Sequence, residues 1–291
     1  MSFFRKFNFS FEVFPPKTKK AADDLDQARQ ELSQLKPKYF SVTFGAGGSL
    51  QQKSLEVVRQ FVAHGIAATP HISCVNMTSQ RLEELLSEYK QLGIKQLLVI
   101  QGDLPSDATP IEIEFNYATE LITAIRTMTG NYFHIIVAAY PEFHPRAISP
   151  ALDIENFKRK IEAGANSAIT QFFFNSDAYF RFLEACDKSS IRIPIIPGIT
   201  PIMNYQKLMQ FSTACGAEIP LWLHKHLKTY SDDPIALQEI GIEFVSKLCG
   251  SLLQNGVKEF HFYTLNRAEP TQSIIQNLVD YKLPYGAKFV I

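Results

Sequence analysis

The sequence lacks an excess of charge of either sign, because its 291 residues include 29 Lys and Arg against 29 Asp and Glu. This balance excludes the electrostatic attraction to nucleic acid or to anionic membrane surfaces that a basic chain would show. Hydrophobic residues make up 46% of the chain, which is enough for a sizeable core. We therefore expect a folded protein that binds neither nucleic acid nor membranes.

Cysteine is also scarce, and the chain has no long apolar run. No segment approaches the roughly 18 uncharged apolar residues that a membrane-spanning helix needs, and the amino-terminal segment lacks the apolar core of a signal peptide. The spacing of the cysteines forms no C-x-x-C pair and no metal-ligand pattern. We expect a cytoplasmic protein without a metal site, whose four cysteines stay reduced: Cys74, Cys186, Cys215 and Cys249.

Short segments of β-type pattern alternate with longer segments of helical periodicity. Such an order implies parallel βαβ units, and eight of them in one chain of this length are typical of a closed (β/α)8 TIM barrel. The connection from Thr200 to Val257 is too long for one helix, so we expect extra helices before the eighth strand. With no linker visible, residues 1–291 are expected to form a single domain. The predicted strands are Asn8–Phe14, Lys38–Phe44, Ala67–Ser73, Gln96–Gln101, His134–Tyr140, Ser167–Phe173, Ile193–Ile196 and Glu259–Thr264.

The first predicted strand has a strict period of two. Phe7, Phe9 and Phe11 alternate with polar residues that include Ser10 and Glu12. Phenylalanines on the outer face of a barrel would pack under the helices, which places Glu12 inside, near the carboxyl end of the strand. Active sites of this architecture lie at that end. An interior glutamate in an ordinary ion pair is the alternative.

Polar residues recur at the ends of the other predicted strands. Packing alone explains one such residue more easily than a set of them, so we interpret the set as an active site. Taken individually, His71 could be a histidine at the barrel rim whose hydrogen bonds are made within the protein, and Asp103 could be a turn residue. The segment Gly45–Gly48 differs from a dinucleotide-binding fingerprint. The set comprises Thr43, His71, Gln101, Asp103, Tyr140, Glu142, Gln171, Tyr263, Asn266 and Arg267.

With these residues in place, the chain resembles the methylenetetrahydrofolate reductase family, in particular the catalytic barrel of its bacterial members. The matching segments run from near residue 10 to near residue 269, which is nearly the whole chain. They include S-F-E-V-F-P-P-K-T from Ser10, P-H-I-S-C from Pro70, A-A-Y-P-E from Ala138, K-R-K-I-E-A-G-A-N from Lys158 and H-F-Y-T-L-N-R-A-E from His261.

The resemblance implies an FAD-dependent oxidoreductase that reduces 5,10-methylenetetrahydrofolate to 5-methyltetrahydrofolate for methionine synthesis. NADH or NADPH would reduce the flavin and leave before the folate binds, in a ping-pong cycle, and the protein would form a homo-oligomer. By the same resemblance, Glu12 is the general acid for the folate N10, and Asp103 favours a cationic intermediate. Gln171, Phe211 and Arg267 are the implied folate contacts. The implied FAD contacts are Thr43, His71, Gly102, Asp103, Tyr140, His144, Asp153, Asn156, Arg159 and Lys160.

Two alternatives stay open beside this interpretation. One is a hydrolase on the same fold that uses Glu12 with Asp103 or Glu142, and the other is a folate-binding barrel without chemistry. Three positions also depart from the family pattern. Gln101 stands where the family often has Arg, Lys207 where Gln is common, and Val13 in place of a Phe after Glu12. We further hypothesise that an apolar lumen lined by some of the 23 phenylalanines holds Glu12 protonated.

Overall fold

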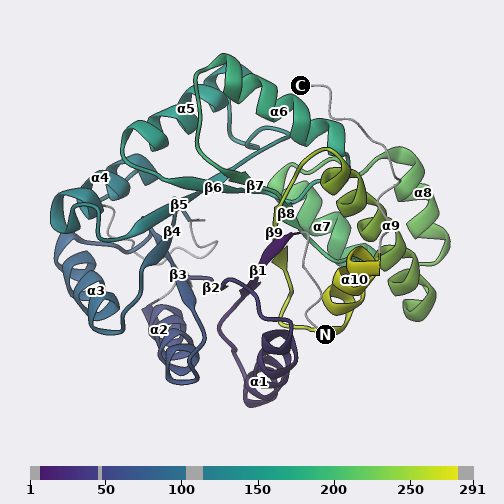
Figure 1. The fold of residues 1–291 in the computed structure, drawn as a ribbon, viewed down its shortest axis with the longest axis horizontal. Coiled ribbons are helices and arrows are strands. Elements are labelled where there is room, and N and C mark those ends of the chain that lie inside the picture. The colour runs from purple at the N-terminus through teal and green to yellow at the C-terminus, as the bar shows by residue number, and fades with distance from the viewer. Residues whose placement is uncertain (1–6, 45–47, 103–113, 281–291) are drawn as a thin grey trace.

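The computed structural model describes residues 7–44, 48–102 and 114–280. Within them, parallel strands form a ring that is surrounded by helices (Figure 1). Strand and helix alternate through most of the chain, as the sequence pattern predicts. The strands are β1 (Asn8–Val13), β2 (Phe40–Val42), β3 (Ala68–Ser73), β4 (Gln96–Ile100), β5 (His134–Ala139), β6 (Ser167–Thr170), β7 (Ile195–Ile196), β8 (Gly198–Ile199) and β9 (Glu259–Tyr263).

The ring closes at Pro197. The hydrogen-bonded order is β7-β6-β5-β4-β3-β2-β1-β9-β8, so β7 and β8 stand at its two ends and are joined by that one residue. Proline has no backbone N–H to give to a ladder, whereas its carbonyl accepts a 3.0 Å hydrogen bond from the His261 amide. The predicted (β/α)8 barrel is thus confirmed. The predicted seventh strand, Ile193–Ile196, is wrong in its bounds, because only Ile195 and Ile196 form β7 and a further short strand, β8, follows Pro197.

Ten helices are seen in the described part of the chain, and side-chain caps begin several of them. The side chains of Thr18, Thr78 and Ser149 each accept an amide hydrogen bond at a helix start. The extra helices expected before the last strand are α7, α8 and α9. The helices are α1 (Lys19–Gln34), α2 (Gly48–Ala63), α3 (Ser79–Gln91), α4 (Ala118–Thr129), α5 (Pro150–Glu162), α6 (Ser176–Lys188), α7 (Tyr205–Cys215), α8 (Leu221–Thr229), α9 (Pro234–Gln254) and α10 (Glu269–Asp280).

Two hydrophobic clusters lie on the two sides of the strand ring. The outer cluster packs under the helices and includes Phe9, Phe11, Phe40 and Phe262, whose rings contact one another at centroid distances of 5.3–6.4 Å. Burial of each ring stabilises the fold by about 2 kcal/mol. The phenylalanines of β1 therefore lie under the helices, as predicted. The smaller inner cluster contains Tyr39, Leu98, Ile136, Ile169 and Ile196.

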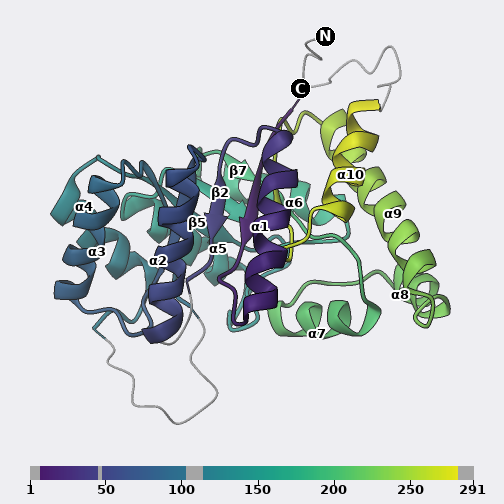
Figure 2. The same cartoon turned by 90° about the horizontal axis from the view of Figure 1, so that it is seen from below.

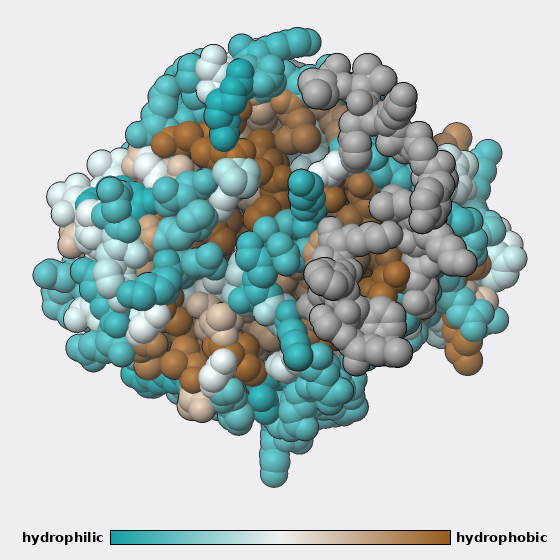
Figure 3. Space-filling view, viewed as in Figure 1, coloured by the Kyte–Doolittle hydropathy of each residue, from teal (hydrophilic) through white to brown (hydrophobic). Residues whose placement is uncertain are grey.

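Helix α7 lies at one end of the barrel. Figure 2 shows α7 on the side of the molecule where β1 leads into α1, which is the side toward which the parallel strands run. The face seen in Figure 3 carries hydrophilic side chains around its rim, with hydrophobic ones visible between them. In the described residues, no helix combines the length and apolarity needed to cross a membrane.

Candidate active site

Glu12 lies on the inner side of the barrel near the carboxyl end of β1. The parallel registers place it level with Ser41 of β2 and Tyr263 of β9. Its Oε2 atom lies 3.5 Å from Nε2 of His71 and 3.8 Å from Nε2 of His261. The Glu12 side chain is 21% exposed, so it can still reach a ligand. Glu12 thus lies inside the barrel, as predicted, and the structure brings it next to His71.

His71 is buried beside this carboxylate. Burial lowers the pKa of the imidazole to about 4, because the charged form loses its hydration; the charge of Glu12 opposes this shift and His261 adds to it. His71 is therefore neutral at pH 7. Its Nε2 atom is buried and makes no hydrogen bond to the described part of the chain. Such an unsatisfied polar atom at the mouth of a barrel fits a ligand with a polar edge.

His261 is a member of the site that the sequence interpretation named only inside a motif. It is fully buried, with Nδ1 2.7 Å from Ser10 Oγ and Nε2 3.4 Å from Ser41 Oγ. The sequence pattern that could have identified it is the period of two in β9, where His261 stands between Phe260 and Phe262. The hypothesis of a phenylalanine-lined lumen is therefore wrong: the phenylalanines face the helices, and hydroxyls and imidazoles surround Glu12.

Tyr263 closes the site on the side of the sixth and seventh strands. Its hydroxyl donates a 2.7 Å hydrogen bond to the carbonyl of Thr170, the last residue of β6. Gly198 allows this close approach, because a Cβ atom there would lie 2.1 Å from the Thr170 carbonyl and 2.7 Å from the Tyr263 ring. Gln171 follows directly, and its Oε1 accepts a hydrogen bond from the Phe172 amide at 3.0 Å.

Four predicted FAD contacts lie between the end of β5 and the last turn of α5. The rings of Tyr140 and His144 meet edge to face at 4.5 Å, and Asp153 Oδ2 accepts the His144 amide at 3.1 Å. Lys160 Nζ donates to the Ala138 carbonyl at 3.0 Å. Burial lowers the pKa of Lys160 to about 8, although Asp153 opposes the shift. This group can supply one ammonium and an aromatic surface.

The remaining two predicted contacts on α5 are directed to solvent. Arg159 is exposed and donates to Glu155 at 3.1 Å and to Asn156 at 3.3 Å. An exposed ion pair of this kind is worth less than about 1 kcal/mol. A phosphate group could therefore take the guanidinium from Glu155 at small cost.

Other predicted residues lie at the carboxyl ends of different strands. Thr43 follows β2 and donates its amide to Val13 at 3.0 Å. Gly102 follows β4 with φ +80°, and a Cβ there would lie 2.9 Å from Ser73 Cβ. Phe211 on α7 and Arg267 after β9 are exposed. Asp103 lies outside the described residues, as does 45–47 of the glycine-rich segment.

Several exposed aromatic side chains stand on the segments that follow strand ends. Phe14 follows β1 and Phe143 follows β5, and both are more than 40% exposed, as is Phe211 of α7. Water-exposed phenylalanines in loops of this kind fit a flat ligand that stacks on them. No group of three or more potential metal ligands occurs in the described residues.

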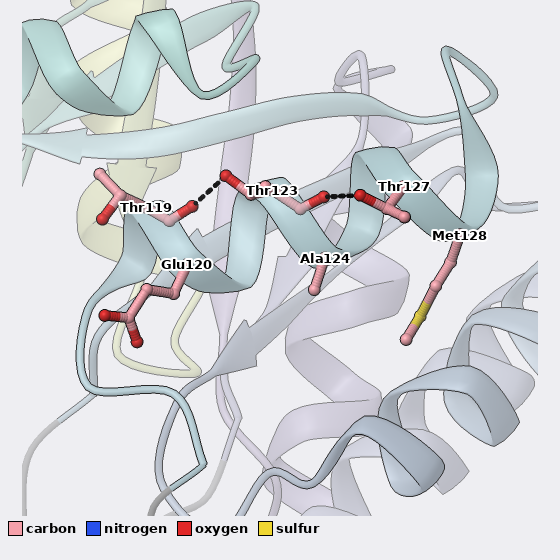
Figure 4. A pocket seen from close by; sticks show the side chains of 6 residues that line it. All are labelled: Thr119, Glu120, Thr123, Ala124, Thr127 and Met128. Atoms are coloured by element: carbon pink, nitrogen blue, oxygen red, sulfur yellow. Dashed lines mark hydrogen bonds between the residues drawn. The ribbon is translucent and has the colours of Figure 1, made fainter.

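A shallow surface pocket along α4 is separate from these residues. Its lining comes from one helix, and Figure 4 shows the hydroxyls of Thr123 and Thr127 bonded to the carbonyls one turn earlier, each at 2.9 Å. None of the predicted site residues lines it. These two hydroxyls are satisfied by the helix itself, and the Glu120 carboxylate accepts the Asn116 amide at 2.7 Å, so this pocket offers no chemistry.

A barrel with a carboxylate and two histidines at the carboxyl end of its strands defines an enzyme-type (β/α)8 protein. The particular family follows from sequence comparison, because residues 3–279 match the model of methylenetetrahydrofolate reductase. The chain therefore belongs to the methylenetetrahydrofolate reductase family.

The curated relatives include 5,10-methylenetetrahydrofolate reductases from bacteria. The protein from Escherichia coli K12 is 38% identical over 93% of this chain and 90% of its own length, and that from Pectobacterium carotovorum is 36% identical over 94% and 90%. A relative from Arabidopsis thaliana, methylenetetrahydrofolate reductase (NADH) 1, is 33% identical over 93% of this chain and 48% of its own length. Similarity thus spans nearly the whole chain.

A solved structure supports the fold. An uncharacterized protein from Clostridium thermocellum, described as binding two copies of 5-methyl-5,6,7,8-tetrahydrofolic acid, superposes with a TM-score of 0.64 over 95% of both chains. The sequence identity is 16%, so this likeness concerns the fold alone.

Proposed function

We propose that this protein is a flavin-dependent reductase, a single catalytic domain that converts 5,10-methylenetetrahydrofolate to 5-methyltetrahydrofolate for methionine synthesis. The observation that carries the proposal is the Glu12 carboxyl group between two imidazoles at the carboxyl end of the barrel. Family membership supports the same reaction. The proposal includes a cytoplasmic homo-oligomer, and the four free cysteines agree with a reducing compartment.

The residues around β5 and α5 suit FAD. When bound, FAD would accept a hydride from NADH or NADPH and pass it to the methylene carbon of the folate. The unsatisfied Nε2 of His71 can bond a polar edge of the isoalloxazine ring. Tyr140 and His144 offer aromatic faces, while Arg159 and Lys160 supply positive charge for the pyrophosphate. Thr43, Gly102, Asp153 and Asn156 complete the proposed contacts.

Glu12 would act as the general acid. Opening of the five-membered ring of the substrate breaks a C–N bond, and a proton on N10 makes that nitrogen a better leaving group. The partly exposed carboxyl of Glu12 can deliver this proton from inside the barrel. Gln171, Phe211 and Arg267 are proposed to hold the folate, and Asp103 to stabilise the cation that forms.

The neutral state of His71 supports this role for Glu12. A protonated imidazole at 3.5 Å would form an ion pair with the Glu12 carboxylate. Because burial lowers the pKa of His71 to about 4, that ion pair is not formed at pH 7. The Glu12 carboxyl group is therefore not paired with an imidazolium, which leaves it able to contact the folate N10.

Two half-reactions test the proposal. The purified protein should carry bound flavin whose absorbance bleaches anaerobically with NADH or NADPH and returns when methylenetetrahydrofolate is added. Glu12→Gln should still bleach, but its reoxidation by the folate should slow by about 10²–10⁴-fold, the usual contribution of a general acid. Glu259→Gln is the matched control, since Glu259 is at the amino end of β9 and binds Lys38 there.

The outcomes separate the competing functions. Protein that binds no flavin favours the two-carboxylate hydrolase. Flavin that is reduced but not reoxidised by the folate favours a non-catalytic binder. Reoxidation at the wild-type rate in Glu12→Gln removes Glu12 from the mechanism.

A further inference from the structure

The loop after β5 contacts the carboxyl end of α7 in two independent ways. The carboxylate of Glu142 accepts a 2.9 Å hydrogen bond from the backbone amide of Glu218. Gly216, which caps α7 with φ +74°, packs so closely that a Cβ atom there would lie 3.0 Å from Cγ of Pro145 and 3.5 Å from the Phe143 carbonyl. One polar contact and one steric contact therefore join this loop to the end of the helix.

The helix held in this way carries Phe211, which is 49% exposed. Phe211 precedes Gly216 by five residues, or about 7.5 Å along a helix axis. Because hydrogen bonds join successive turns of a helix, a contact that fixes the end of α7 also fixes the backbone position of Phe211. Figure 2 shows α7 on the side where the strands end.

We propose that Glu142 is a positioning residue that holds α7 through the Glu218 amide and so sets the place of Phe211 over the folate. The inference rests on the proposed function for the part that concerns the folate. It also assigns a role to a carboxyl group that the proposed chemistry does not use.

The charges that face Glu142 make this contact sensitive to pH. Burial raises the pKa of Glu142 to about 7; the Glu218 carboxylate adds to the shift, while the Glu218 amide and Arg181 of α6 oppose it. The thiol of Cys215 on α7 has a pKa raised chiefly by burial, so it is neutral in this range.

The direction of the pH effect follows from linkage. A Glu142 released into water would ionise near its ordinary pKa of 4.5, whereas in the closed loop it ionises near 7. The contact is therefore fully favoured below pH 4.5 and is weakened as the pH rises through about 7.

The single tryptophan of the chain reports on this contact. Trp222 lies on α8, four residues after Glu218, with its ring edge to face with Phe244 at 5.5 Å. Its fluorescence in the wild-type protein should change with a midpoint near pH 7. In Glu142→Gln, whose amide oxygen can accept the same hydrogen bond without ionising, this transition should be absent. In Glu142→Ala the emission should match the high-pH wild-type state at every pH.

Kinetics give a second readout. Glu142→Ala should raise the KM for methylenetetrahydrofolate by about tenfold, which is the loss of one well-placed aromatic contact, and change the turnover number by less than about threefold. Glu142→Gln should keep a low KM at about pH 8, where the wild-type KM has risen.

Several results would overturn the inference. A fluorescence transition that persists in Glu142→Gln does not arise from Glu142 and overturns the pH dependence of the contact. An unchanged KM in Glu142→Ala removes Glu142 from the positioning of Phe211. Failure of flavin bleaching in the wild-type protein would refute the proposed function, and the fluorescence titration would still decide whether Glu142 holds α7.

Discussion

Burial of a neutral His71 beside Glu12 should make the protein sensitive to acid. The pKa of this imidazole is about 4 in the folded state, compared with an ordinary value of 6.5. As the pH falls below 6.5, the unfolded chain takes up a proton that the folded protein does not, so folding is progressively disfavoured until about pH 4. The difference of about 2.5 between the two pKa values corresponds to about 3 kcal/mol.

Replacement by a side chain that does not titrate isolates this effect. Between about pH 7.5 and about pH 4.5 the free energy of unfolding should fall in both proteins. The fall should be smaller in His71→Gln than in the wild type, by about 2–3 kcal/mol. Urea unfolding followed by circular dichroism measures both values. Because the comparison is between proteins at the same pH, contributions from other titrating groups cancel.

A surface histidine provides the control. His64 follows α2 and is exposed, so His64→Gln should retain the acid sensitivity of the wild type. If His71→Gln and the wild type lose the same free energy between the two pH values, His71 is not buried in its neutral form and the reasoning fails.

Three further substitutions test contacts within the site and, for Arg126, at the opposite end of the barrel. Gly198→Ala would bring a Cβ within 2.1 Å of the Thr170 carbonyl, so we expect a loss of about 3 kcal/mol in urea unfolding. Arg126→Met would leave three backbone carbonyls without the guanidinium that bonds them. We expect the free energy of unfolding to fall by about 3 kcal/mol, measured as a lower midpoint of thermal unfolding. The Asn266 side chain bonds both the amide and the carbonyl of Phe14, at 2.9 and 2.8 Å. Asn266→Ala should therefore slow flavin reoxidation by the folate about tenfold, measured by stopped-flow absorbance, with bleaching by NADH retained.

The barrel and the inward position of Glu12 could be predicted from local patterns. A period of two in β1 separates the two faces of a strand without knowledge of its neighbours, and the order of strands and helices identifies a parallel sheet. The interruption between β7 and β8 at Pro197 was harder to predict from the sequence. A proline indicates a missing donor, but the ring closes there only because His261 bonds the Pro197 carbonyl from β9.

The parts of the site that could not be predicted depend on contacts between distant residues. The contact between Ser10 and His261 joins positions 251 apart, and that between Glu142 and Glu218 joins positions 76 apart. Periodicity shows that such residues face inward or stand at a strand end, but not which of them meet. The assumption that phenylalanines surround Glu12 failed for this reason, because its neighbours come from other strands.

The two faces of the strands give the site both its rigidity and its reactivity. Interlocked rings such as Phe9, Phe11 and Phe262 fix β1 against β9 from outside, so the inner residues cannot move apart without breaking that packing. Glu12 and His71 are thereby held in contact even though the imidazole Nε2 atom has no hydrogen bond, an arrangement that costs free energy in the absence of a ligand. A ligand that bonds this atom recovers part of that cost on binding. Under the proposed function this ligand is the flavin, whose polar edge can bond Nε2 of His71.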